Sequence, residues 1–174
     1  MRVFLLSAFA AVSAIAAIPA AAHADAMADA KAIIEQHKQM PVFEPPGEPF
    51  DAKSCMAGKK VLSIPITMTI PFNVELQKAM ASAAKEVGFT YTTWDNQLKT
   101  DQWIQGVSQA ISQKYDVLDL AGGLNPEWLG PQLTEARAAG LKISITHLYD
   151  VTQKSAPTVD YSSRVDFTQA GKIL

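Results

Sequence analysis

From Lys60 onward, short apolar runs alternate with helix-length amphipathic segments. The first run, residues 61–66, is almost continuously apolar, which is typical of a strand buried on both faces of a sheet. A helix is expected next. Its inner positions by helical spacing are Leu76, Met80, Ala83 and Val87. Strands that are connected through helices lie parallel, so the sequence predicts an α/β fold, a parallel sheet with helices on both faces.

The same alternation continues to the end of the sequence. We expect further strands at 89–94, 117–120 and 142–146, with a helix capped by Asp101 after the second strand and a helix with Leu129, Leu133 and Ala136 inside after the third. A fifth strand is expected at 158–162, and Asp166 then caps a helix that has barely begun when the sequence stops. Since one helical turn gains little stability, we interpret the chain as a fragment rather than a complete short protein.

Residues 1–24 have the pattern of a secretory signal peptide. Arg2 supplies the positive charge, residues 3–18 the apolar core, and Ala22-His23-Ala24 a small-x-small cleavage site. The alternative is a transmembrane anchor, but the run is rich in alanine and ends at Pro19, short of the ~20 strongly apolar residues that a span requires. We therefore predict export to the periplasm, with no membrane insertion after cleavage.

Residues 25–59 are expected to be an extension in front of the α/β part. Its first half, 25–40, has the composition of a marginal helix. The prolines of segment 41–58 disfavour regular structure, which predicts a linker or strap. The predicted organisation is then a first α/β lobe at 60–157, followed by a crossover and the start of a second lobe, largely absent, at 158–174.

Several function classes are excluded by what the sequence lacks. The 15 basic and 17 acidic side chains nearly cancel and do not cluster, which argues against a nucleic-acid partner. His37, His147 and the single cysteine, Cys55, are not at metal-ligand spacing, and one cysteine allows no internal disulfide. Gly122-Gly123 fails the spacing of a dinucleotide-binding loop. We predict no metal, no cofactor and no catalytic residue.

The loops after the strands are the remaining candidates for a site. In open parallel sheets, ligands bind outside the carboxyl ends of the strands. The loops expected at that edge are 67–73, 95–97, 121–126 and 147–150, which mix aromatic and hydrogen-bonding side chains. Such a rim can hold a neutral polar molecule, with an aromatic face on a ring and amides on its hydroxyls.

Three segments in order carry a family resemblance: Ile64-Pro65-Ile66, then Ile70-Pro71-Phe72-Asn73-Val74-Glu75-Leu76, then Ala83-Ala84-Lys85-Glu86-Val87-Gly88. They resemble the opening of type I periplasmic solute-binding proteins of sugar ABC transporters, which are similar to ribose-binding protein. The segment 138–143 and the pairs Val165-Asp166 and Gly171-Lys172 fit the same template. The resemblance covers about Lys60 to Leu174. It implies a periplasmic-binding-protein-like first lobe, and ligand capture by closure of two lobes.

The resemblance implies a ligand-binding set of Phe72, Asn73, Gly122, Gly123, Asn125 and His147. Phe72 would stack on the sugar, Asn73 would line the cleft wall beside it, and His147 stands where the family has a carboxylate that binds ring hydroxyls. Each has a structural alternative. Phe72 can pack at a helix start, Asn73 and Asn125 can cap helices, and His147 can be an ordinary structural residue. Gly122 and Gly123 would allow close backbone approach.

Together these features predict a monomeric periplasmic substrate-binding component of an ABC importer, which captures a sugar or similar small polar solute and delivers it to a membrane permease. It would not be an enzyme. Ile70, where an asparagine is common, and Ala121 and Gly122, where a polar residue is common, leave room for a less hydroxylated or anionic ligand. Two other classes stay open: a secreted α/β enzyme with catalytic residues outside this chain, and a ligand sensor that docks on a chemoreceptor.

Overall fold

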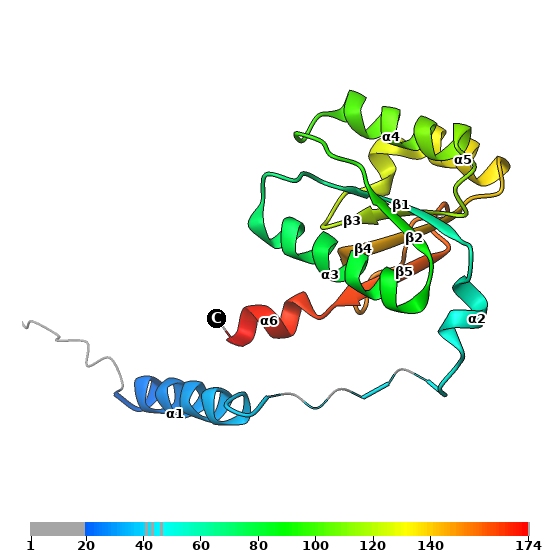
Figure 1. The fold of residues 1–174 in the computed structure, drawn as a ribbon. Helices are drawn as coiled ribbons and strands as arrows, with labels where there is room; N and C mark the ends of the chain where they lie inside the picture. Colours follow the sequence, from blue (N-terminus) through cyan, green and yellow to red (C-terminus); the bar gives the residue numbers. More distant parts are fainter. Residues whose placement is uncertain (1–19, 41, 43, 46, 174) are drawn as a thin grey trace, which may run out of the picture. The chain divides into compact units, whose positions relative to one another are not determined.

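The computed structural model describes residues 20–40, 42, 44–45 and 47–173 (Figure 1). Most of the predicted signal peptide therefore lies outside the described residues. Helix α1 (Ala20–Gln36) begins at the predicted cleavage region and forms a unit by itself, separate from the α/β lobe of residues 44–172. Among the described residues, no helix is both long and apolar enough to cross a bilayer.

The lobe is built on one sheet of five parallel strands in the order β2-β1-β3-β4-β5. This confirms the predicted parallel α/β fold. The strands are β1 (Lys60–Pro65), β2 (Thr90–Thr93), β3 (Val117–Ala121), β4 (Lys142–Asp150) and β5 (Tyr161–Val165).

Helices cover both faces of this sheet, with α4 and α5 on one face and α3 on the other (Figure 1). The helices of the lobe are α2 (Ala52–Met56), α3 (Pro71–Val87), α4 (Thr100–Ser112), the 3-10 turn η1 (Pro126–Leu129), α5 (Gly130–Ala138) and α6 (Phe167–Ile173). Glycines in the left-handed conformation end two of them: Gly88 follows α3 with a φ of 96° and Gly140 ends the turn after α5 with a φ of 94°.

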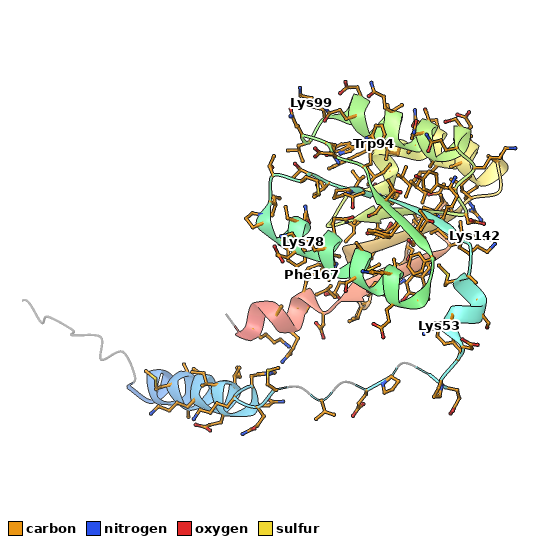
Figure 2. The ribbon with its side chains drawn as sticks, viewed as in Figure 1. Lys53, Lys78, Trp94, Lys99, Lys142 and Phe167 are labelled. Carbon is orange, nitrogen blue, oxygen red and sulfur yellow. The ribbon has the colours of Figure 1, made fainter. Side chains whose placement is uncertain are left out.

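The apolar core lies between the sheet and helices α4 and α5. Every second residue of three central strands points into it and is almost fully buried: Leu62, Ile64, Leu118, Leu120, Ile143 and Ile145. Trp103 and Val107 of α4 and Leu133 of α5 pack against these strand residues in the same core. Figure 2 shows charged side chains such as Lys78 and Lys142 at the periphery, where their side chains are 67% and 74% exposed. The face of the sheet that α4 and α5 cover therefore supplies most of the hydrophobic stabilisation.

The opposite face of the sheet, which α3 covers, has the polar side chains Ser63 and Asp119 beside the apolar Val61. The prediction of the inner face of α3 is wrong in part. The buried residues of α3 are Asn73, Gln77 and Ala84, whereas Ala83 is exposed. The reason is that α3 packs on strand residues that offer hydrogen bonds. Gln77 Nε2 donates to Ser63 Oγ over 3.1 Å, so helical periodicity of apolar residues did not mark this face.

Two predictions about helix starts before the last strands need correction. Segment 41–58 contains helix α2, whose N-terminus is capped by the Asp51 carboxylate accepting from Lys53 N and Ser54 N. Asp101 lies in the first turn of α4 and does not cap it, because the helix begins one residue earlier, after Lys99. Both differences arise at helix starts, where local hydrogen bonds decide the boundary.

The last two strands also differ from the prediction. Strand β4 was expected to end at Thr146 and instead continues to Asp150, because it pairs again with β5 through Asp150 and Val165. Strand β5 is shifted from 158–162 to Tyr161–Val165. The expected cap at Asp166 is confirmed, since its Oδ1 accepts from Gln169 N over 2.7 Å.

Candidate functional site

The most irregular backbone of the sheet lies at His147, near the carboxyl end of β4. The pairing of β4 with β5 shifts register between Thr146 and Asp150, and His147 has a φ of 60°. A histidine in the left-handed region is strained by roughly 1–3 kcal/mol, and strain of this kind gathers at functional sites. His147 Nδ1 and Thr146 Oγ1 are buried without a hydrogen-bond partner among the described residues. Two neighbouring residues at this bulge thus each have a buried polar atom without a partner among the described residues.

Phe72 faces His147 across the same edge of the sheet. It lies in the first turn of α3, directly after Pro71, whose fixed φ suits a helix start. The two rings meet edge to face, with centroids 5.1 Å apart and an angle of 75° between planes. Phe72 remains 54% exposed, so its ring offers a free aromatic surface beside the imidazole.

Asn73 follows Phe72 in the first turn of α3 and is only 1% exposed. Its Nδ2 donates to Thr67 O over 2.8 Å, which ties the start of α3 to the loop after β1. Its Oδ1 lies against Gly122, where an added Cβ would come within 2.1 Å of that oxygen. The structure thus places Asn73 under the rim as a residue that positions two loops, and not on the rim surface.

The two glycines of the loop after β3 bring its backbone against the bulge. Gly122 and Gly123 have φ values of 64° and 92°. Gly123 N donates to Thr146 O over 3.3 Å, so the loop after β3 is tied to the last residue before His147. Phe72, Asn73, Gly122, Gly123 and His147 are therefore brought together at one edge. We call these five residues the rim cluster.

Asn125 plays a local part. Its side chain accepts from Glu127 N over 3.0 Å and so caps η1, the capping role that the sequence had left open beside ligand contact. Among the described residues, no side-chain hydrogen bond joins Asn125 to the rim cluster.

A set of hydrogen bonds around Trp103 and Asn96 ties the loop after β1 to the loop after β2. The sequence did not predict these two residues as part of a site. The Nε1 of Trp103 donates to Ile66 O and to Asn96 Oδ1, each over 3.1 Å. Asn96 is 2% exposed, and its Nδ2 donates to Pro65 O over 2.8 Å. Trp103 also stacks on Trp128 at 5.6 Å between centroids, so three loops of the carboxyl edge meet at one indole.

A buried carboxylate occupies the polar face of the sheet behind the rim cluster. Asp119 of β3 is 4% exposed and accepts hydrogen bonds from Ser63 Oγ at 2.9 Å and Ser144 Oγ at 2.8 Å. Burial raises the pKa of the Asp119 carboxyl above its usual range, because desolvation outweighs the two hydroxyl donors and the nearby His147. Nearby, burial also raises the pKa of Tyr91 to about 12.

The raised pKa of Asp119 predicts a pH-dependent cost to folding. The folded protein holds the Asp119 proton at pH values where the unfolded chain has lost it, so stability falls as pH rises above the ordinary pKa of 3.8. We expect Asp119→Asn to increase the free energy of unfolding at pH 7 and to have little effect at pH 3. Urea unfolding at both pH values measures this. A destabilised variant at pH 7 would contradict it.

Only some of the residues that build the site could be predicted from the sequence. The carboxyl edge, Phe72 and His147 follow from the order of strands and loops. Gln77, Asp119 and Asn96 were missed, because their partners are far away in the chain. One sequence signal could have found them: a polar residue at a position that the period of the strand or helix assigns to the buried face. Within the part of the chain that the structure describes, no cluster of metal-ligating side chains is present.

Comparison with known proteins gives a match at the level of structure. No protein-family model matches the sequence, and no curated protein matches it either. A solute-binding protein of an ABC transporter from Agrobacterium vitis, solved with bound allitol, matches with a TM-score of 0.57 and 18% identity over 67% of this chain and 38% of its own. A sugar ABC transporter subunit from Rhodobacter sphaeroides matches with a TM-score of 0.54 and 18% identity over 64% and 38%.

A third structure, a solute-binding protein from Mycobacterium smegmatis with bound glycerol, matches with a TM-score of 0.52 and 22% identity, over 61% of this chain and 35% of its own. The chain thus spans less than two-fifths of the length of each of these three structures. At these identities the likeness concerns the fold. The chain therefore has the periplasmic-binding-protein-like α/β fold, over a lobe-sized part of the solute-binding proteins that it matches.

Proposed function

We propose that this chain provides a solute-binding lobe of the periplasmic substrate-binding component of an ABC importer, and that the rim cluster contacts a sugar or similar small polar solute. The observation that carries the proposal is the pairing of a half-exposed aromatic ring with a strained imidazole at the carboxyl edge of a parallel sheet. The fold shared with three ABC transporter proteins supports it.

Each part of the rim cluster has a use in holding a polyol. The exposed face of Phe72 covers the apolar face of a ring or carbon chain. His147 brings an imidazole whose buried Nδ1 has no hydrogen-bond partner among the described residues, and a turn of the ring would allow it to hydrogen-bond to a hydroxyl of the solute. Gly122 and Gly123, both with positive φ, bring the loop after β3 against Asn73 and the backbone of His147, which fixes this side of the rim cluster. This arrangement binds a neutral molecule reversibly and performs no bond chemistry.

We propose that the solute is held between this lobe and a second lobe. The closed form would then dock on a membrane permease, which takes up the solute. A second lobe would add hydrogen bonds worth ~1 kcal/mol each, and four of them correspond to roughly a thousandfold in dissociation constant. Binding to residues 44–172 alone is therefore expected to be weak, and NMR is the suitable measurement.

Phe72→Ala tests the assigned site. We expect allitol, glycerol or D-ribose to shift the NMR signals of Phe72 and His147 in the parent chain, and the variant to bind the active compound five- to tenfold more weakly, as loss of an aromatic contact of ~1 kcal/mol implies. The melting temperature should change little, because Phe72 is 54% exposed.

Phe167→Ala is the matched control, since Phe167 is 46% exposed and lies in α6 outside the rim cluster. It should leave binding unchanged. Two results would count against the proposed function: no compound of this class perturbs the rim cluster, or the bound compound is converted to a product.

A further inference from the structure

A cavity of about 720 Å³ lies at the amino edge of the sheet, where α2 meets the loops before β3 and β4. Val117 and Lys142, which line it, are the first residues of β3 and β4, whereas the rim cluster lies where these strands end. No residue of the rim cluster lines it. Its volume is within the ordinary range of small-molecule sites. We call it the amino-edge cavity.

Lysines give the amino-edge cavity a surplus of positive charge. Lys59, Lys114 and Lys142 line it, and among the described residues that line it Asp116 is the single acidic one. The Asp116 carboxylate accepts from Lys60 N over 2.8 Å and from Lys59 Nζ over 3.0 Å. These two bonds hold the pKa of the Asp116 carboxyl below its usual range. One ammonium group is thus matched by this carboxylate, and those of Lys114 and Lys142 are in excess.

Lysines at this edge of a sheet can serve to compensate the carboxyl ends of helices, since α4 and α5 both end here. Other side chains already fill that role. Lys60 Nζ donates to Gln113 O directly after α4, and Arg137 is the basic residue in the last turn of α5. Lys114 Nζ makes no ion pair with any of the described residues. Its charge is therefore available to a ligand.

The ammonium group of Lys142 is only loosely held. Its Nζ lies 3.9 Å from Asp160 Oδ1, and the same oxygen is 3.3 Å from Arg137 Nη2. Asp160 does not line the amino-edge cavity. The Lys142 side chain is 74% exposed, so its ammonium group can turn toward an anion in the cavity at little cost.

The walls between the lysines are apolar. Met56 of α2, Ile111 of α4 and Val117 of β3 line the cavity and are half-buried, so each keeps apolar surface in contact with water. A ligand with an apolar body would cover this surface, whereas a bare ion would leave it wet.

We propose that the amino-edge cavity is a binding site for a small organic anion with an apolar body, of the class of aromatic phosphates. Lys114 and Lys142 would donate to the anionic oxygens, and the apolar body would lie against the half-buried walls. Charge-assisted hydrogen bonds favour this class over neutral molecules of the same shape. The site is distinct from the rim cluster in place and in ligand chemistry, since a polyol carries no charge.

Phenyl phosphate and benzenesulfonamide are matched probes, since each joins one phenyl ring to a tetrahedral head group and only the phosphate is charged at pH 7. We expect NMR titration of the full chain to give a dissociation constant about tenfold smaller for phenyl phosphate. Signals of Met56, Ile111 and Val117 should shift. Inorganic phosphate should bind about threefold more weakly than phenyl phosphate, because it leaves the apolar walls uncovered.

Cys55 gives a second readout, because its exposed thiol lines the amino-edge cavity. We expect saturating phenyl phosphate to slow the reaction of Cys55 with N-ethylmaleimide, and benzenesulfonamide at the same concentration to have little effect. Unchanged labelling with phenyl phosphate bound would place the ligand elsewhere and contradict the proposal.

Lys114→Gln should weaken the binding of phenyl phosphate about fivefold and leave that of benzenesulfonamide unchanged. Lys114 is exposed, so the melting temperature should change little. Lys99→Gln is the matched control, because it removes the same charge from an exposed lysine that does not line the cavity. Figure 2 shows Lys99 far from Lys142 on the lobe. This control should bind phenyl phosphate as the parent does.

Phe72→Ala should also retain the binding of phenyl phosphate, which separates this test from the test of the proposed function. The proposal is overturned if phenyl phosphate and benzenesulfonamide bind equally, if neither binds, or if Lys99→Gln weakens binding as much as Lys114→Gln. Equal binding of inorganic phosphate and phenyl phosphate would also contradict it, because the apolar walls would then contribute nothing.

Discussion

Gly122→Ala is expected to lower the free energy of unfolding by about 3 kcal/mol. Two independent effects add at this residue. Its φ of 64° is strained for any residue with a Cβ, and that Cβ would lie 2.1 Å from Asn73 Oδ1. Asn73 cannot simply turn away, because its side chain is buried and bound to Thr67 O. Urea unfolding followed by circular dichroism measures the loss, and a fall of roughly 6–12 °C in melting temperature should accompany it.

Gly123→Ala is the matched control for this prediction. Its φ of 92° is equally unsuited to alanine, but the nearest atom to an added Cβ is His147 O at 3.5 Å, an ordinary contact. It should therefore cost only the backbone strain, about 1 kcal/mol. The double variant Asn73→Ala/Gly122→Ala should cost less than the two single changes added together, because the clash is gone. If Gly122→Ala and Gly123→Ala are equally destabilising, the close contact with Asn73 is not significant.

Sequence patterns predicted the sheet because the signals for it are local. The buried strands are apolar runs, and Gly88 and Gly140 mark the ends of helical segments that periodicity had already defined. The inner face of α3 could not be predicted in this way. Asn73 and Gln77 are buried because Thr67 and Ser63 offer hydrogen bonds, and periodicity assigns polar residues to the surface.

The candidate site shows the same division. Phe72 could be placed at the carboxyl edge, because it follows a strand and a proline at a helix start. The bulge at His147 could not, since it depends on how β4 pairs again with β5 through Asp150 and Val165. A register shift between strands is set by contacts that no single segment encodes. The role of Asn73 as a residue beneath the rim depends likewise on Gly122, in a different loop.

Trp103→Ala is expected to destabilise the lobe by about 3–5 kcal/mol, the largest loss among the predicted single changes. Trp103 is 4% exposed and belongs to the core between the sheet and α4. Its removal leaves a large void and also removes the donor to Ile66 O and Asn96 Oδ1. Urea unfolding gives the total, and amide hydrogen exchange at Met68 and Leu98 would report whether the loops after β1 and β2 open first.

Trp103→Phe separates packing from hydrogen bonding. It keeps most of the apolar contact and loses both Nε1 bonds, so we expect a cost of about 1–2 kcal/mol. Trp128→Ala, which removes only a half-exposed stacking partner, should cost about 1 kcal/mol. If Trp103→Phe were as damaging as Trp103→Ala, the indole N–H would dominate, and the carboxyl edge would be held by hydrogen bonds. The expected order, with the alanine variant far more damaging, instead means that the loops of the candidate site are anchored through the core itself.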